Sequence, residues 1–90
     1  MIVKMTKVSE NDNKWIDSIG VRDGLLGYIR HEPRIGEGVT LFYADDARKD
    51  SAILYTTRVN HINFTQSEGA APNWIISTAN TTYLIEKIGD

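Results

Sequence analysis

The second half of the chain reads as two consecutive β-hairpins, and this pattern constrains the fold more than any other feature of the sequence. Runs rich in Val, Ile, Thr, Tyr, Phe and Trp are typical of strands, and Gly, Asp, Asn and Pro cluster in the turns between them. The predicted strands come in two pairs, Gly38–Tyr43 with Ser51–Phe64 and Asn73–Thr78 with Thr81–Ile88. The sequence therefore predicts a small, mainly antiparallel β structure.

The longest of these runs, Ser51–Phe64, changes phase along its length. Ile53 and Tyr55 share one face, whereas Ile62 and Phe64 have the opposite parity. Such a change predicts a β-bulge or a sharp bend, here around Arg58–His61. Because a bent strand can belong to both halves of a small barrel, the phase change favours a barrel over a flat sheet.

The first half of the chain is less regular. Ile2–Val8 predicts an opening strand, and Ser9 is a candidate N-cap for a short helix whose apolar stripe includes Trp15 and Ile19 and which ends at Gly20. Residues 21–31 allow two interpretations, a second short helix or an irregular strand, and any helix there should end before Pro33.

Together these patterns predict a mainly β (α+β) fold, a five-stranded antiparallel SH3-like or PUA-like barrel with one short helix after the first strand. With 90 residues the chain is expected to form one domain, residues 1–90. The absence of cysteine excludes disulfides and thiolate chemistry. We find no signal-peptide pattern and no apolar run of the ~20 residues that a membrane span needs, so a cytoplasmic location is expected.

Charge and motif content argue against several functions. The net charge is -2 and the basic residues are scattered, which disfavours nucleic acid as a partner. His31 and His61 belong to no metal or nucleophile motif, and the acidic turn around Asp45, Asp46 and Asp50 does not have the spacing of an EF-hand. We therefore expect no catalytic residues, no metal site and no cofactor.

One candidate binding segment is cationic. Arg30, His31 and Arg34 lie within five residues of one another, on a predicted loop. Guanidinium and imidazolium groups bind phosphates and carboxylates, so this segment is a candidate anion site. A solvated turn is the alternative interpretation.

A second group of candidates lies on the predicted hairpins. Arg58, Thr78 and Tyr83 are expected to contribute to a polar groove on threonine-rich strands, although threonine is also an ordinary solvent-facing strand residue. Trp74 follows the predicted loop Thr65–Pro72 and is a candidate contact residue in an interface, with packing in the core as the alternative.

The segments Tyr55–Ile62 and Trp74–Leu84 are similar to a pattern in small uncharacterised phage and prophage proteins. That pattern is a strand with paired Thr or Ser, followed by Thr-x-Asn-Ser/Thr and a tyrosine before the last strand. The resemblance covers the C-terminal part of the chain and implies a viral origin and a compact barrel. It implies no catalytic residues, because the group has no established activity.

These observations lead to two functional hypotheses of different classes. The first is a non-enzymatic interaction protein, phage-encoded, that binds a host protein in the host cytoplasm and acts in host takeover or anti-defence. The alternative is an oligomeric small-molecule binder, a nucleotide sponge. A monomer of this size has little room for a pocket, so its site is expected to form between subunits. Its candidate ligand-binding residues are Arg30, His31, Arg34, Arg58, Thr78 and Tyr83.

Overall fold

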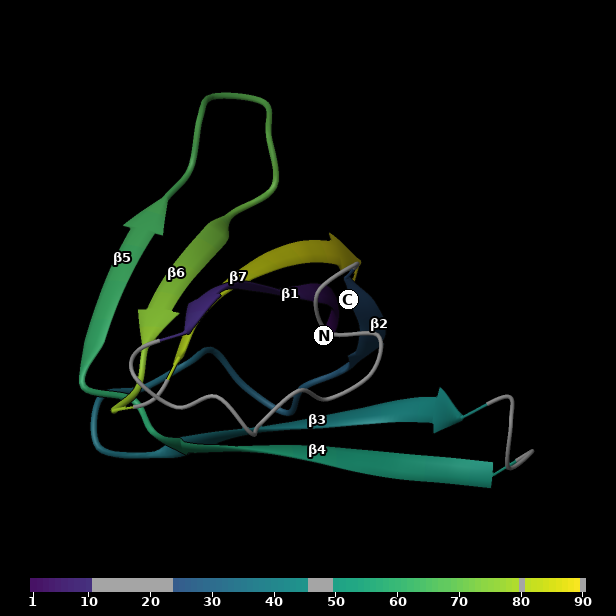
Figure 1. Cartoon of the computed structure of the whole chain (residues 1–90). Helices are drawn as coiled ribbons and strands as arrows, with labels where there is room; N and C mark the ends of the chain where they lie inside the picture. The colour runs from purple at the N-terminus through teal and green to yellow at the C-terminus, as the bar shows by residue number, and fades with distance from the viewer. Residues whose placement is uncertain (11–23, 46–49, 80, 90) are drawn as a thin grey trace.

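The computed structural model describes residues 1–10, 24–45, 50–79 and 81–89, and in this part of the chain every regular element is a strand (Figure 1). The strands are β1 (Ile2–Glu10), β2 (Leu25–Tyr28), β3 (Gly38–Asp45), β4 (Asp50–Arg58), β5 (His61–Thr65), β6 (Asn73–Ser77) and β7 (Thr81–Gly89). They form one 7-stranded sheet in the order β4-β3-β2-β1-β7-β6-β5. All six neighbouring pairs are antiparallel.

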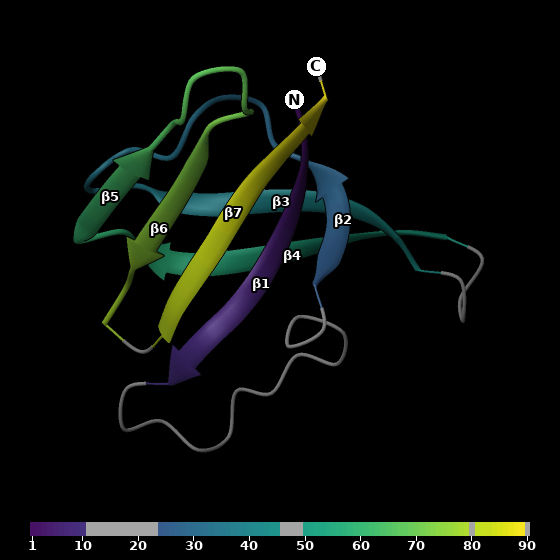
Figure 2. The same ribbon diagram turned by 90° about the horizontal axis from the view of Figure 1, so that it is seen from above.

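The sheet folds over on itself into two layers. β1, β7, β6 and β5 form one layer, β3 and β4 form the other, and β2 joins them along one side (Figure 1). Seen from above, the strands of the two layers cross (Figure 2). The sheet is not closed, because β4 and β5 are its two edges and do not pair with each other.

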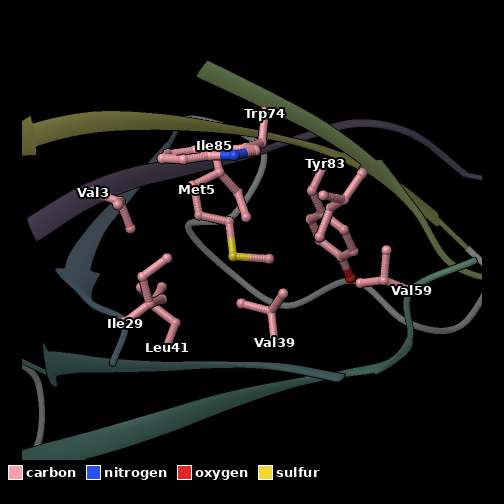
Figure 3. Packing of buried hydrophobic residues seen from close by; sticks show 10 residues of the cluster. Val3, Met5, Ile29, Val39, Leu41, Val59, Trp74, Tyr83 and Ile85 are labelled. Carbon is pink, nitrogen blue, oxygen red and sulfur yellow. The ribbon is translucent and has the colours of Figure 1, made fainter. Parts of the chain in front are cut away.

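The hydrophobic core fills the space between the layers (Figure 3). Each strand contributes the side chains of one parity, as expected for a sheet with one buried face. The buried hydrophobic residues are Val3, Met5, Ile29, Val39, Leu41, Val59, Trp74, Ile76, Tyr83 and Ile85.

The predicted bend is present and connects the two edge strands. β4 ends at Arg58 and β5 begins at His61, at the opposite end of the strand order. Val59 is buried and its N–H donates to the carbonyl oxygen of Glu37 over 2.9 Å. The N–H of Asn60 donates to the carbonyl oxygen of Ser77 over 2.8 Å, next to the β5–β6 ladder. The phase change in the sequence therefore marks the point where the chain passes from one layer to the other.

Other predictions about the fold need correction. The described residues contain seven strands rather than five, and the sheet is open. β1 continues to Glu10, so Ser9 is a strand residue and not a helix cap. The remainder of the predicted helix, including Trp15 and Gly20, lies outside the described residues. Of residues 21–31, the described part contains a strand at Leu25–Tyr28, and residues 21–23 lie outside the described residues.

Candidate functional site

A hollow lies on the outside of the β3–β4 hairpin. It has a volume of about 420 Å³ and is bounded on one side by the segment that follows β2. Its lining residues are Ile29, Arg30, His31, Glu32, Pro33, Arg34, Gly38, Val39, Thr40, Phe42, Ile53 and Tyr55. We call this hollow the β3–β4 pocket. Its volume lies within the range of small-molecule sites, roughly 300–1,000 Å³.

Strand alternation places the apolar wall of the pocket. Val39 and Leu41 of β3 point into the core, so Thr40 and Phe42 lie on the outer face of the sheet. In β4 the register sets Ile53 opposite Phe42 and Tyr55 opposite Thr40. Ile53 is 56% exposed and Tyr55 is 74% exposed, so two large apolar side chains stand at the surface beside the pocket.

The opposite wall, residues 29–34, is anchored at both ends by backbone hydrogen bonds. Ile29 is buried, and its N–H donates to the carbonyl oxygen of Met1 over 3.0 Å. The N–H of Gly36 donates to the carbonyl oxygen of Val59 over 2.8 Å. Pro33 is buried between these anchors. The segment is therefore held against the sheet, and the pocket has two fixed walls.

Positive charge gathers on this wall. The guanidinium carbon of Arg30 lies 5.3 Å from the centre of the Phe42 ring, a cation–π contact that holds the arginine over the apolar wall. Arg34 also lines the pocket, against one acidic lining residue, Glu32. The pocket thus combines an aromatic surface with a small excess of positive charge. This combination suits an anionic group attached to an apolar or planar one.

His31 is tied to its neighbours. Its Nδ1 lies 2.7 Å from the carbonyl oxygen of Glu32, so this nitrogen carries the hydrogen and donates it. Its Nε2 lies 3.9 Å from Oε2 of Glu37, with both side chains about half exposed. The imidazole is therefore oriented by the loop itself.

Apolar residues continue from the pocket across the outer face of four strands. Ile53 pairs with Phe42, Phe42 pairs with Tyr28, and Tyr28 pairs with Ile2. We call these four residues the outer apolar row. Ile2 is 44% exposed and Tyr28 is 46% exposed, whereas Phe42 is partly buried and has the guanidinium of Arg30 over its ring. Contiguous apolar patches of this kind mark sites of protein or ligand binding.

The structure brings together only part of the predicted site. Arg30, His31 and Arg34 all line the β3–β4 pocket. Arg58 is exposed at the end of β4, outside the lining of the pocket. One copy of the chain forms this hollow alone, and a ligand site between subunits stays a prediction.

The remaining predicted site residues are buried. Trp74 is 3% exposed and packs in the core, so its ring presents no face to a partner. Tyr83 belongs to the same core. Thr78 is buried, and its Oγ1 accepts a hydrogen bond from the N–H of Thr81 over 3.2 Å. These residues stabilise the fold and do not line a groove with the arginines.

Sequence reasoning missed the apolar half of the site. Phe42, Ile53 and Tyr55 line the pocket, but in the sequence they resemble ordinary core residues. The available signal was the apolar content on both faces of the strand Val39–Tyr43, which cannot all be buried in a two-layered domain of this size.

Among the described residues, no group of three or more His, Asp or Glu side chains is placed to hold a metal ion. The predicted acidic turn falls partly outside those residues, since Asp46 is not described. No helix in the described part of the chain is long and apolar enough to cross a membrane.

Comparisons with protein-family models, with curated proteins and with solved structures give no match for this chain.

Proposed function

We propose that this chain is a non-enzymatic interaction protein that binds a partner protein through the outer face of β2, β3 and β4. The observation that carries the proposal is the outer apolar row, which runs from Ile53 to Ile2 and adjoins the β3–β4 pocket. Burying these exposed side chains in an interface is favourable by roughly 25 cal/mol per Å² of apolar surface. Arg30 and Arg34 at the margin favour a partner with acidic groups around an apolar anchor.

The proposal includes an origin and a location. We propose a phage-encoded protein that acts in the host cytoplasm on a host protein, in host takeover or anti-defence. The resemblance of Tyr55–Ile62 and Trp74–Leu84 to phage and prophage proteins supports this origin. A relation between the open sheet and SH3-like or PUA-like barrels also stays a prediction.

A capture experiment with matched variants tests the interaction. Tagged wild-type protein is incubated with bacterial lysate beside Tyr28→Ser, which shortens the outer apolar row, and Ile75→Ser, which removes an exposed apolar side chain from β6. We expect a protein that the wild type and Ile75→Ser retain and that Tyr28→Ser loses. Equal retention by both variants, or no enriched protein at all, would refute this surface as the binding site.

A second candidate function is supported by the β3–β4 pocket itself. A hollow of about 420 Å³ with two arginines and two aromatic residues suits a small molecule with a planar ring and an anionic group, such as a nucleotide. In this case the protein acts as a nucleotide-binding protein, the sponge hypothesis. The polar residues that bind the anion would be Arg30, His31 and Arg34.

Thermal shift against a panel of nucleotides tests the second candidate. Arg34→Ala removes a cation from the lining, and Arg58→Ala removes an exposed arginine outside it, so the two variants are matched. A nucleotide site predicts a shift in the wild type and in Arg58→Ala that Arg34→Ala loses. Flat responses in all three proteins would eliminate nucleotides as ligands.

A further inference from the structure

The outer edge of β4 has a central stretch without charged residues or proline, and this stretch ends at a β-bulge at Thr56 and Thr57. β4 is one end of the strand order, and no described strand pairs with its outer side. Exposed edges are usually protected by charged residues or proline, because they otherwise pair with other chains. Residues 52–57, Ala-Ile-Leu-Tyr-Thr-Thr, contain neither. β4 also has 9 residues, whereas β5 at the opposite edge has 5.

We propose that two copies of this chain associate through antiparallel pairing of β4 with β4, centred on Leu54, so that the two sheets continue across a two-fold axis. The partner is a second copy because the strand is complementary to itself in this register. In a two-fold interface each contact occurs twice, once in each direction. The inference does not depend on the proposed binding partner.

The central residues give the favourable pairs. With Leu54 opposite Leu54 of the second copy, Ile53 lies opposite Tyr55 and Ala52 lies opposite Thr56. Ile53 and Tyr55 have the same parity and are exposed on the outer face, so the pair joins a β-branched and an aromatic side chain. Such cross-strand pairs stabilise a sheet by about 0.2–1 kcal/mol each, and the symmetry provides two of them.

The ends of the strand agree with the same register. Its first residue, Asp50, and its last residue, Arg58, have opposite charges and come to the same margin of the interface when the strands run antiparallel. The ladder between β3 and β4 is regular from Asp45↔Asp50 to Thr40↔Tyr55, and the register shift lies beyond it, towards Gly38. The two Ile53–Tyr55 pairs therefore lie in the regular part of β4, whereas Thr56 belongs to the β-bulge.

This pairing changes the site as well as the oligomeric state. Ile53 and Tyr55 line the β3–β4 pocket, so the second copy would lie directly beside its apolar wall. The two pockets would flank the two-fold axis, and the outer apolar row of one copy would continue onto β4 of the other. The dimer would thus present one extended surface with residues from both chains.

Sedimentation equilibrium of the full chain tests the proposal with two double variants. Ile53→Lys with Tyr55→Lys places like charges opposite each other across both symmetric pairs, and should weaken dimerisation by at least about tenfold. Ile53→Glu with Tyr55→Lys changes the same positions but places opposite charges across each pair, and should restore the dimer relative to the first variant. Because both side chains are exposed, circular dichroism should show that every variant is folded.

Asn63→Lys provides the control, since it adds a charge to an exposed position of the other edge strand, β5. We expect this variant to dimerise like the wild type. A wild-type protein that is monomeric at near-millimolar concentration would overturn the proposal. A like-charge variant that dimerises as well as the wild type would overturn the β4 interface, and an opposite-charge variant as weak as the like-charge one would overturn the register.

Discussion

Replacement of Thr56 by valine should destabilise the protein, because the hydroxyl of Thr56 accepts a hydrogen bond from the N–H of Val39 and donates one to the carbonyl oxygen of Thr57. The register between β3 and β4 moves from Thr40↔Tyr55 to Gly38↔Arg58, so two residues of β4, Thr56 and Thr57, lie opposite the single residue Val39. This is a β-bulge, which leaves the ladder locally incomplete. The Oγ1 of Thr56 replaces the missing acceptor, because it takes a hydrogen bond from the N–H of Val39 over 2.8 Å at a buried position.

The expected cost follows from what the substitution leaves behind. Valine has nearly the shape of threonine, so the packing is retained while the Val39 N–H loses its acceptor. An unsatisfied buried donor costs about 1–3 kcal/mol. In a domain of this size each kcal/mol lowers the melting temperature by about 4–8 °C. Thr56→Val should therefore melt at least about 4 °C below the wild type.

Thermal and urea unfolding, followed by the fluorescence of the tryptophans, measure the effect. Thr57→Val is the matched control, because Thr57 is the exposed neighbour, and the substitution retains its backbone carbonyl, which accepts the hydrogen bond from Thr56 Oγ1. We expect this control to change the free energy of unfolding by less than about 0.5 kcal/mol. If the two valine variants have the same stability, the hydroxyl of Thr56 does not support the bulge and the argument fails.

Three further substitutions test other parts of the fold. Gly27→Ala should destabilise the contact between β2 and β3 and lower the urea midpoint, because a Cβ at residue 27 would lie 2.7 Å from the carbonyl oxygen of Phe42. An unchanged midpoint would contradict the close approach of the two strands at Gly27. Trp74→Ala should cost about 3–5 kcal/mol of folding free energy by emptying part of the core, and a wild-type midpoint would place the ring at the surface instead. Thr78→Val should lower the free energy of unfolding by about 1 kcal/mol, because the N–H of Thr81 loses its acceptor. The same unfolding curves measure this change, and unchanged stability would show that the turn between β6 and β7 does not need the hydroxyl.

Alternation in the sequence predicted strands and the bend, but not which face of β4 is buried. Parity alone separates Ile53 and Tyr55 from Leu54 and Thr56, and both sets contain apolar residues. The choice is made by the pairing of Leu54 with the buried Leu41 in β3. This pairing turns Leu54 inwards and leaves Ile53 and Tyr55 on the surface. Such long-range register is not visible in a single strand.

The candidate site could be predicted only where its residues are neighbours in sequence. Arg30, His31 and Arg34 lie on one loop, and all three line the β3–β4 pocket in the folded protein. The aromatic wall requires that this loop pack beside the outer face of β3 and β4, which depends on anchors as distant as Met1. The predicted polar groove on the threonine-rich strands does not form, because the threonine side chains are used within the fold. Their buried members, such as Thr78, have hydrogen-bond partners within their own turn.

The composition of the rows that cross the outer face of the sheet supports the proposal that the outer apolar row is a binding surface. The row that crosses the other layer, Asn63–Ile75–Leu84–Thr6, has polar residues at both ends. The outer apolar row has no polar residue at either end, and it ends at the edge strand β4. A short chain has a modest core, so exposed apolar side chains do not help it to fold and expose it to aggregation. Binding, by a partner protein, a ligand or a second copy, gives a physical reason for a row of four apolar residues that crosses β4, β3, β2 and β1.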